Sequence, residues 1–152
     1  MIRKRERAVW NNEGTVVFKG TAYLGNGTRV ANTGTLTLGN NFQVSGNSSI
    51  ICRHETTFGD YVLIAWDCMF MDGDAHKVYS DEVGVQVNTN RPIVVGNHVW
   101  FGAKCTVTKG AKIPDGCVIA ANSCVYKKFE EENTIIGGYP AKVIRKNIRW
   151  EG

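Results

Sequence analysis

The sequence predicts an all-β fold, a parallel β-helix of about five coils. The first observation is a period of six, because from residue 95 onward a large apolar side chain returns at every sixth position: Val95, Phe101, Val107, Ile113, Ile119 and Val125. The second is a smaller residue four positions after each of the first five: Val99, Cys105, Ala111, Cys117 and Ser123. The third is the count of 17 glycines against 3 prolines, which favours many tight turns. A period of six fits neither a helix nor a simple alternating strand, but it fits short flat faces joined by turns.

The N-terminal half has the same period in a longer frame. Three triplets of apolar residues begin twenty positions apart: Phe18, Leu24 and Val30; Leu38, Val44 and Ile50; Phe58, Ile64 and Phe70. Twenty residues correspond to three six-residue faces with two extra residues at one corner. Three faces per coil predict a triangular prism whose neighbouring coils pair as parallel strands about 4.8 Å apart. The members of each triplet should then stack along three interior edges.

We expect three parts along the chain. Residues 1–15 should form an N-terminal arm, residues 16–128 the β-helix, and residues 129–152 a capping segment. The stretch 71–92 breaks the period and should leave the prism as an excursion, where function tends to concentrate. In the capping segment, Thr134 to Gly138 should form a strand and Pro140 should begin a short C-terminal helix.

Composition narrows the class of protein. The chain has 152 residues, 43% of them hydrophobic, which suffices for one domain with a core. A net charge of +4 predicts no nucleic-acid partner, and a cluster of four cations near the start is expected to be a solvated arm: Arg3, Lys4, Arg5 and Arg7. No apolar run is long enough for a membrane span. Five cysteines without a CxxC pair favour reduced thiols and a soluble, cytoplasmic protein.

Three segments resemble the hexapeptide-repeat acyltransferases, which are left-handed β-helix enzymes: VGNHVWFGAKCTVTKGAKIPDGCVIAANSCV (95–125), GGYPAKVIRK (137–146) and FGDYVLIAWDCMFMDGDAHKVYSD (58–81). The last resembles the branch that O-acetylates sugars and bacterial surface polysaccharides. The resemblance covers residues 16–146. It implies the left hand of the coil, acetyl-CoA as donor, a homotrimer, and an active site between neighbouring prisms.

Acetyl transfer to a hydroxyl group needs a base, and histidine, whose unperturbed pKa is about 6.5, suits that task near neutral pH. His76 is expected where the prism gives way to the excursion, and it matches the family's catalytic histidine. Asp72 and Asp74 flank it, and either would fix its tautomer and stabilise the imidazolium. His98 is expected to be a surface residue, and His54 a turn residue at a corner.

The resemblance also implies a coenzyme groove. Its candidate phosphate-binding cations are Lys127, Lys142 and Arg145. The pantetheine arm is expected to lie near four small residues: Gly102, Ala103, Ala120 and Ala121. Trp66 and Trp100 should point outward, one at the trimer interface and the other in the acceptor or coenzyme cleft, with either assignment open; as candidate site residues, Trp100 would contact the coenzyme and Trp66 the acceptor. Cys68, Cys105 and Cys117 should be core residues.

Other functions stay open at this point. N-acetylation of an amino sugar needs the same base, and a non-catalytic trimeric scaffold would have the same fold. A gamma-class carbonic anhydrase is disfavoured because His54, His76 and His98 are 22 residues apart and no HxxxxH pair occurs, so no metal is expected. The acceptor sugar, the position acylated and the acyl-chain preference are left undetermined.

Overall fold

The computed structural model describes residues 7–152, which contain eighteen β-strands and no helix. The strands are β1 (Val9–Asn12), β2 (Thr15–Phe18), β3 (Ala22–Leu24), β4 (Arg29–Asn32), β5 (Thr35–Leu38), β6 (Phe42–Val44), β7 (Ser49–Cys52), β8 (Glu55–Phe58), β9 (Leu63–Ile64), β10 (Met69–Met71), β11 (Ile93–Val95), β12 (Trp100–Phe101), β13 (Thr106–Thr108), β14 (Lys112–Ile113), β15 (Val118–Ile119), β16 (Cys124–Val125), β17 (Ile135–Gly138) and β18 (Ala141–Arg145).

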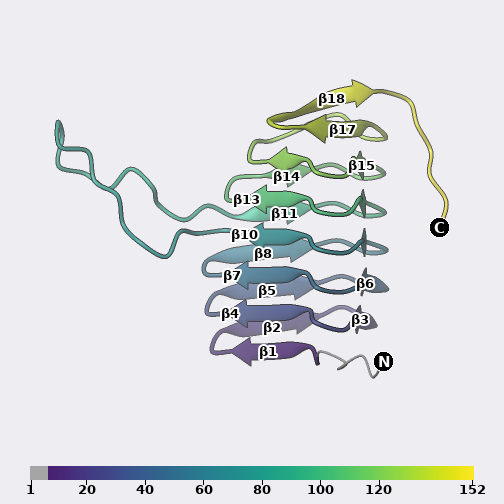
Figure 1. The fold of residues 1–152 in the computed structure, drawn as a ribbon, viewed down its shortest axis with the longest axis horizontal. Helices are drawn as coiled ribbons and strands as arrows, with labels where there is room; N and C mark the ends of the chain where they lie inside the picture. Colours follow the sequence, from purple (N-terminus) through teal and green to yellow (C-terminus); the bar gives the residue numbers. More distant parts are fainter. Residues whose placement is uncertain (1–6) are drawn as a thin grey trace, which may run out of the picture.

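Three sheets form the walls of a triangular prism. Sheet A has the order β1-β4-β7-β10-β13-β16, sheet B the order β14-β11-β8-β5-β2, and sheet C the order β18-β17-β15-β12-β9-β6-β3. All pairs are parallel except β17 with β18. The chain passes through A, B and C in turn, so the six strands of sheet A mark six coils (Figure 1).

Strand register confirms the predicted stacking of the triplets. Leu38 pairs with Phe18 in the coil before it and with Phe58 in the coil after it. The twenty-residue step also extends one coil further back than we predicted, because Trp10 pairs with Val30. The β-helix therefore begins with β1, inside the segment 1–15 expected as an arm, and it has six coils rather than five.

At two corners of the prism, five coils each place one residue in the left-handed backbone region. All of these residues have φ between 50° and 73°. The corner from sheet B to sheet C contains Asn41, Tyr61, His98, Gly116 and Asn133, and the corner from sheet C to sheet A contains Gly27, Asn47, Asp67, Lys104 and Asn122. Glycine, asparagine and aspartate tolerate this conformation best, which explains why these residue types recur between the apolar positions.

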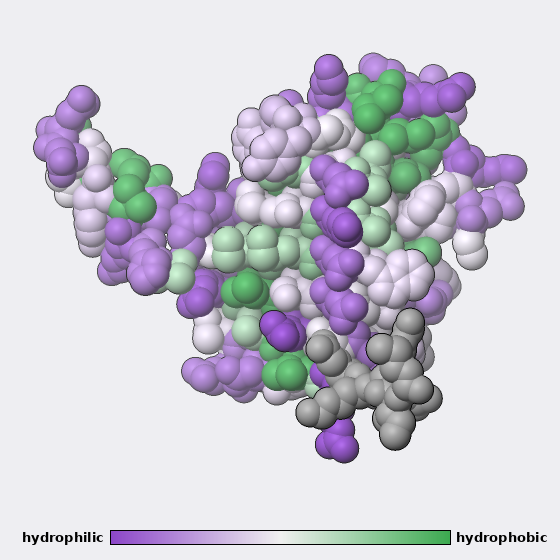
Figure 2. All heavy atoms as spheres, in the orientation of Figure 1, coloured by the Kyte–Doolittle hydropathy of each residue, from purple (hydrophilic) through white to green (hydrophobic). Residues whose placement is uncertain are grey.

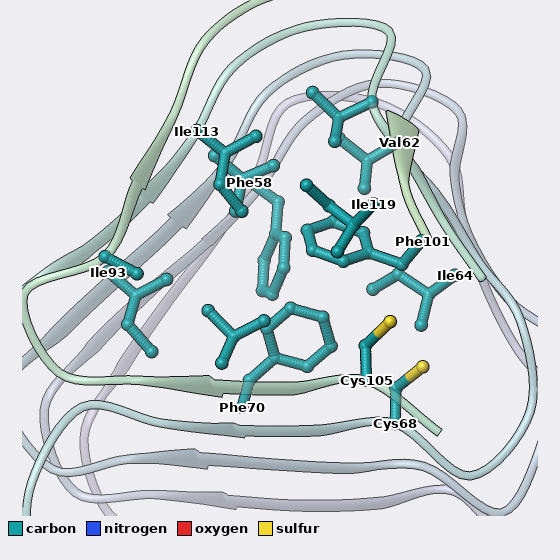
Figure 3. Packing of buried hydrophobic residues seen from close by; sticks show 14 of the residues in the cluster. Phe58, Val62, Ile64, Cys68, Phe70, Ile93, Phe101, Cys105, Ile113 and Ile119 are labelled. Carbon is teal, nitrogen blue, oxygen red and sulfur yellow. The ribbon is translucent and has the colours of Figure 1, made fainter. Parts of the chain in front are cut away.

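The interior is a continuous column of apolar side chains. Phe58, Phe70 and Phe101 are fully buried, and the centres of neighbouring rings lie 5.1 and 5.0 Å apart in edge-to-face contact. Figure 3 shows these rings in the middle of the triangular section. The three cysteines expected in the core are buried with free thiols: Cys68, Cys105 and Cys117. Stacking one bulky and one small side chain per face fills each coil, so the scaffold is rigid where the excursion leaves it.

The C-terminal segment contains a strand where we predicted a helix. β17 continues sheet C, as expected for Thr134 to Gly138, but residues 141–145 form β18, which pairs with β17 in antiparallel orientation. The prediction of a helix at Pro140 is wrong because the segment alternates with a period of two. Ala141 and Val143 pack on the prism while Lys142 and Ile144 are exposed. Beyond β18 the chain runs back along the outside of the prism (Figure 1).

The excursion leaves between β10 and β11, as the broken period predicts, and projects far from the prism (Figure 1). Its outer part is an antiparallel loop in which the Ser80 amide donates to the Val85 carbonyl at 2.9 Å and the Val87 amide to the Val78 carbonyl at 2.8 Å. Figure 2 shows apolar groups part of the way along this hydrophilic arm. Of the basic cluster near the start, Arg3, Lys4 and Arg5 lie outside the described residues, and Arg7 is exposed. Residues 7–152 contain no helix that is long and apolar enough to cross a membrane.

Candidate active site

One hydrogen-bonded cluster fixes the base of the excursion to the prism. Lys109 Nζ, just after β13, lies 2.5 Å from Asp74 Oδ2 and 3.0 Å from the carbonyl oxygen of Asn88. Asn88 Nδ2 donates to Asp74 Oδ2 at 2.8 Å and to the carbonyl oxygen of His76 at 2.7 Å. The Val78 amide donates to Asn88 Oδ1 at 2.7 Å. The cluster thus joins the two arms of the excursion and fixes the backbone at His76.

Asp74 is a stable negative charge in this cluster. Hydrogen bonds from the Lys109 ammonium and the Asn88 amide hold the pKa of the Asp74 carboxyl below its usual range, and the charge of Arg91 acts in the same direction. The Lys109 side chain is only 15% exposed, whereas that of Asp74 is 39% exposed. Asp74 is therefore ionised near neutral pH, two residues from His76.

His76 lines a groove of about 300 Å³ between the arms of the excursion, together with Asp74, Lys77 and Asn90. The side chain is exposed, and no hydrogen bond to its ring occurs among residues 7–152. Both ring nitrogens are thus accessible to a substrate that enters the groove. The backbone on which the ring stands is held, while the ring itself is free.

Asp72, expected beside His76, turns away from it. Its carboxylate is fully buried under the corner between sheets A and B, where it accepts hydrogen bonds from the Arg53 amide at 2.6 Å, the His54 amide at 3.2 Å and Thr56 Oγ1 at 3.0 Å. The amides of Arg53 and His54 and the buried hydroxyl of Thr56 need an acceptor at this corner, and Asp72 supplies it. The structure therefore gives Asp72 a role in holding the start of the excursion rather than a contact with His76.

A second groove, of about 730 Å³, adjoins the first along the chain. Asn90 lines the first groove and Arg91 the second, where the Gly110 amide donates to the Pro92 carbonyl at 3.0 Å. Four cations line the second groove: Arg91, Lys112, Lys127 and Lys128. Only Lys112 has a carboxylate partner among the described residues, with its Nζ 2.9 Å from Glu130 Oε2. Pro92, Val94 and Tyr126 add an apolar floor. Unpaired cations around an apolar floor suit a ligand that carries phosphates on an apolar chain.

Trp100 and Arg145 share a third groove, of about 390 Å³, on the outside of sheet C. Trp100 is 39% exposed and Trp66 is 57% exposed, so both point outward as predicted. Trp66 lies at the corner from sheet C to sheet A and does not line the third groove. Lys142 is an exposed residue of β18.

The small residues predicted near the coenzyme stack in neighbouring coils at the corner from sheet C to sheet A. The Gly102 amide donates to the Ile119 carbonyl at 2.8 Å, and the Asn122 amide to the Ala103 carbonyl at 3.0 Å. A Cβ at Gly102 would lie 2.7 Å from the Ala121 amide nitrogen, so coil stacking alone requires glycine there. Ala120 and Ala121 follow one coil later.

The candidate residues thus fall into separate places on one protomer. His76 and Asp74 lie on the excursion, Lys127 lies in the cationic groove beside it, and Trp100 and Arg145 lie on sheet C. None of the grooves lined by the described residues contains all of them.

The other histidines lie elsewhere. His54 is exposed at the corner between sheets A and B, and His98 is exposed at the corner between sheets B and C, where its ring stacks on Trp150. Within residues 7–152 no three His, Cys, Asp or Glu side chains come together in an arrangement that would hold a metal ion.

Asn88 and Lys109 were not among the predicted site residues. Lys109 follows a repeat strand, and its partner Asp74 is 35 positions away. Asn88 lies in a polar stretch of the excursion and contacts Asp74 across 14 positions. No local pattern marks either residue, because the contact exists only after the excursion has folded back on itself.

Comparison with known proteins agrees with this architecture. A family model described as the hexapeptide repeat of succinyl-transferase matches residues 92–127. The galactoside O-acetyltransferase of Escherichia coli K12 is 33% identical over 109 residues, which cover 72% of this chain and 53% of that protein. The polysialic acid O-acetyltransferase of Neisseria meningitidis is 30% identical over 160 residues, which cover 86% of this chain and 74% of that protein. The chain therefore spans about half the length of the first relative and about three quarters of the second.

Solved structures of acetyltransferases share the fold. The polysialic-acid-specific acetyltransferase NeuO superposes with a TM-score of 0.74 at 20% identity, covering 97% of this chain and 74% of that one. A galactoside acetyltransferase in complex with coenzyme A gives a TM-score of 0.57 at 25% identity, covering 87% and 64%. The six-residue repeat, the prism and the identity to the polysialic acid enzyme show that the chain belongs to the hexapeptide-repeat acyltransferases, left-handed parallel β-helix proteins, in the branch of the sugar and polysaccharide O-acetyltransferases.

Proposed function

We propose that this protein transfers an acetyl group from acetyl-CoA to a hydroxyl group of a sugar or polysaccharide, with His76 as the general base. The observation that carries the proposal is the position of His76, whose backbone is fixed by Asn88 and whose ring is free in a groove that adjoins four cations. The relatives named for galactosides and polysialic acid support a saccharide as acceptor.

In this mechanism His76 removes the proton of the acceptor hydroxyl as its oxygen attacks the thioester carbonyl. The carbon–sulfur bond then breaks, and the sulfur leaves with the proton that the imidazolium returns. The ionised Asp74 lines the same groove as His76 and gives that groove a negative charge. The hydrogen bond from Asn88 to the His76 carbonyl holds the backbone of the base in one position, which favours a reactive orientation of its ring.

The cationic groove supports acetyl-CoA as the donor. Coenzyme A carries a pyrophosphate and a 3′-phosphate, and Lys127 with its neighbouring cations offers charge of the opposite sign. Pro92, Val94 and Tyr126 provide an apolar surface for the pantetheine arm. The coenzyme-bound structure of the galactoside acetyltransferase is consistent with this donor. Lys142, Arg145 and the small residues around Gly102 remain part of the proposal as further coenzyme contacts.

The same proposal includes a homotrimer. Four valines on the excursion are more than half exposed: Val78, Val83, Val85 and Val87. Apolar side chains on a projecting arm are stabilised when another surface covers them. The candidate residues lie on different faces of one prism, and a cyclic trimer would bring the face of one protomer against the excursion of the next. Trp66 would contact the acceptor or the neighbouring subunit.

A cytoplasmic location belongs to the proposal as well, because the five cysteines are free thiols.

The test is an assay of thiol release from acetyl-CoA with a panel of neutral and acidic saccharides. We expect release with a subset of acceptors, and His76→Ala to lower kcat by about 10²- to 10⁴-fold while thermal unfolding is unchanged. His54→Ala is the matched control, because His54 is another exposed histidine but lies at a corner of the prism outside the groove, and this variant should retain the activity of the wild type. Full activity of His76→Ala would end the assignment of the base, and absence of transfer to every acceptor would end the proposed reaction.

A further inference from the structure

The segment after β18 forms an ordered strap along the corner between sheets B and C. The Ile148 amide donates to the carbonyl oxygen of Asn133 in the last coil at 2.9 Å. Trp150 then reaches His98, two coils back, and Gly152 lies beside Leu63 in the coil before that. Figure 1 shows this descent along the prism. The strap is therefore attached at several levels.

Trp150 is interlocked with His98. The two rings are parallel within 4° and their centres are 4.0 Å apart. The indole Nε1 donates to the carbonyl oxygen of His98 at 3.0 Å, and His98 Nε2 lies 3.0 Å from the carbonyl oxygen of Trp150. His98 has φ of 52°, so its ring leaves the corner in a direction that an ordinary strand residue would not give. Stacking and two reciprocal hydrogen bonds hold the indole in one orientation.

Held in this way, Trp150 becomes one wall of the groove on sheet C. Its ring centre is 6.1 Å from that of Trp100, at an angle of 44°. Val118, Ile135 and Ile148 complete the apolar surface of this groove, whose volume is about 390 Å³. The groove would have no second aromatic wall without the strap, because Trp100 alone contributes an indole from the prism.

The charged side chains that line the groove are all positive. Arg145 and Arg149 line it, no carboxylate does so among the described residues, and Asn147 contributes the only amide side chain. Glu151 Oε1, outside the lining, lies 3.2 Å from Arg149 Nη2, and both side chains are largely exposed. The hydroxyl groups of a sugar both donate and accept hydrogen bonds, whereas Asn147 is the only lining side chain with an acceptor oxygen. Two indole walls with guanidinium groups instead fit a flat heteroaromatic ring that carries phosphate.

We propose that Trp150, oriented by His98, is a donor-specificity residue that stacks on the adenine ring of acetyl-CoA, with Arg145 and Arg149 facing the phosphates of its adenosine end. This inference rests on the proposed function, since acetyl-CoA is the nucleotide which that reaction uses. The cationic groove beside His76 and the groove on sheet C lie on different faces of the prism. A coenzyme that contacts both therefore lies between two protomers, with its phosphates between the cations of the two grooves, its adenosine on one protomer and its pantetheine arm on the other.

The test measures binding and turnover separately. Calorimetry gives Kd for coenzyme A and for adenosine 3′,5′-bisphosphate, and kinetics give kcat and KM for acetyl-CoA and for S-acetyl-4′-phosphopantetheine, which lacks the adenosine. We expect Trp150→Ala to raise Kd for both nucleotides and KM for acetyl-CoA by about 5- to 100-fold, the range for loss of base–aromatic stacking. The kcat should stay within about twofold, and turnover of the truncated donor should not change.

Further variants separate the effect of the orientation of the Trp150 indole from the effect of its presence. His98→Ala keeps both indoles but releases Trp150, so it should weaken nucleotide binding in the same direction and to a smaller extent. Tyr23→Ala is the control, because Tyr23 is exposed on sheet C, far along the prism from this groove, and its Kd should equal that of the wild type. Thermal unfolding of each variant checks the fold, and Trp150→Phe, which keeps a ring, should retain most of the affinity.

The possible failures are distinguishable. If the wild type binds coenzyme A and Trp150→Ala binds it equally well, the role of Trp150 is wrong and the proposed function stands. If Trp150→Ala raises KM for the saccharide and not for acetyl-CoA, the groove belongs to the acceptor and the inference is overturned. If the wild type neither binds coenzyme A nor transfers acetyl groups, both proposals fall together.

Discussion

Replacement of Asn88 by alanine should release the base of the excursion without unfolding the prism. The substitution removes two hydrogen bonds that Asn88 donates, to Asp74 at 2.8 Å and to the His76 carbonyl at 2.7 Å, and two that it accepts, from the Val78 amide at 2.7 Å and from Gln86 Nε2 at 3.3 Å. A neutral hydrogen bond contributes about 0.5–1.5 kcal/mol and one to a charged group about 1.5–3 kcal/mol. Because water replaces part of each in this exposed segment, we take the low ends and expect a local loss of about 2–4 kcal/mol.

Two measurements report on this loss. Hydrogen exchange of the Val78 amide should accelerate by about 30-fold or more, since 1.4 kcal/mol corresponds to a factor of ten in the opening equilibrium. The kcat should fall by at least about tenfold because His76 is no longer held in one position. The melting temperature should fall by no more than a few degrees, because the excursion opens independently of the coils.

Glu82→Ala is the matched control, because Glu82 is exposed at the outer end of the same excursion and makes none of the described hydrogen bonds. It should leave exchange, kcat and melting temperature as in the wild type. If Asn88→Ala exchanges and turns over like this control, the cluster at the base does not position His76, and the reasoning is refuted.

Three other predictions concern the core, the thiols and pH. Phe101→Ala should destabilise the protein by about 3–5 kcal/mol, measured by chemical denaturation, because the ring is fully buried against Phe70; a loss below about 1 kcal/mol would contradict the packing. A chromogenic disulfide reagent at pH 8 should modify Cys124 first among the five thiols, because the other four are buried. Burial and the charge of Asp72 also raise the pKa of the Cys52 thiol to about 11. Rapid modification of all five thiols would contradict this and show that the coils open readily. The pKa of the Asp74 carboxyl is lowered in the folded protein, so the stability that Asp74 gives to the excursion is present above the ordinary pKa of aspartate and is lost as pH falls through the lowered value. Hydrogen exchange of the Val78 amide, corrected for its intrinsic pH dependence, should therefore accelerate only in acid. Loss of its protection already at pH 6 would contradict this.

The repeat could be predicted from the sequence because every coil has the same interior to fill and the same corners to turn. One bulky side chain fills each face, one small one fits each corner, and Gly, Asn or Asp supplies the left-handed turn, so position in the chain determines position in the prism. The coil that we missed carries Trp10, which pairs with Val30 but is 41% exposed at the open end of the prism, and a single aromatic residue at the end of the array gave too short a run to establish the period. The error at Pro140 has a similar cause, because a proline followed by apolar residues fits both a first helical turn and the strand that pairs with β17.

Sequence alone determined the all-β class, the six-residue repeat and the exit of the excursion, and it predicted His76 as the base, because these features depend on residues that are neighbours in the chain or recur at a fixed interval. Only the tertiary structure decided which groups surround that histidine: it turned Asp72 into a corner acceptor, brought Lys109 and Asn88 to Asp74, and laid Trp150 on His98 across 52 positions. The physical reason is that such contacts form between irregular segments, whose paths are set by how they pack on the finished prism rather than by any periodic pattern within themselves.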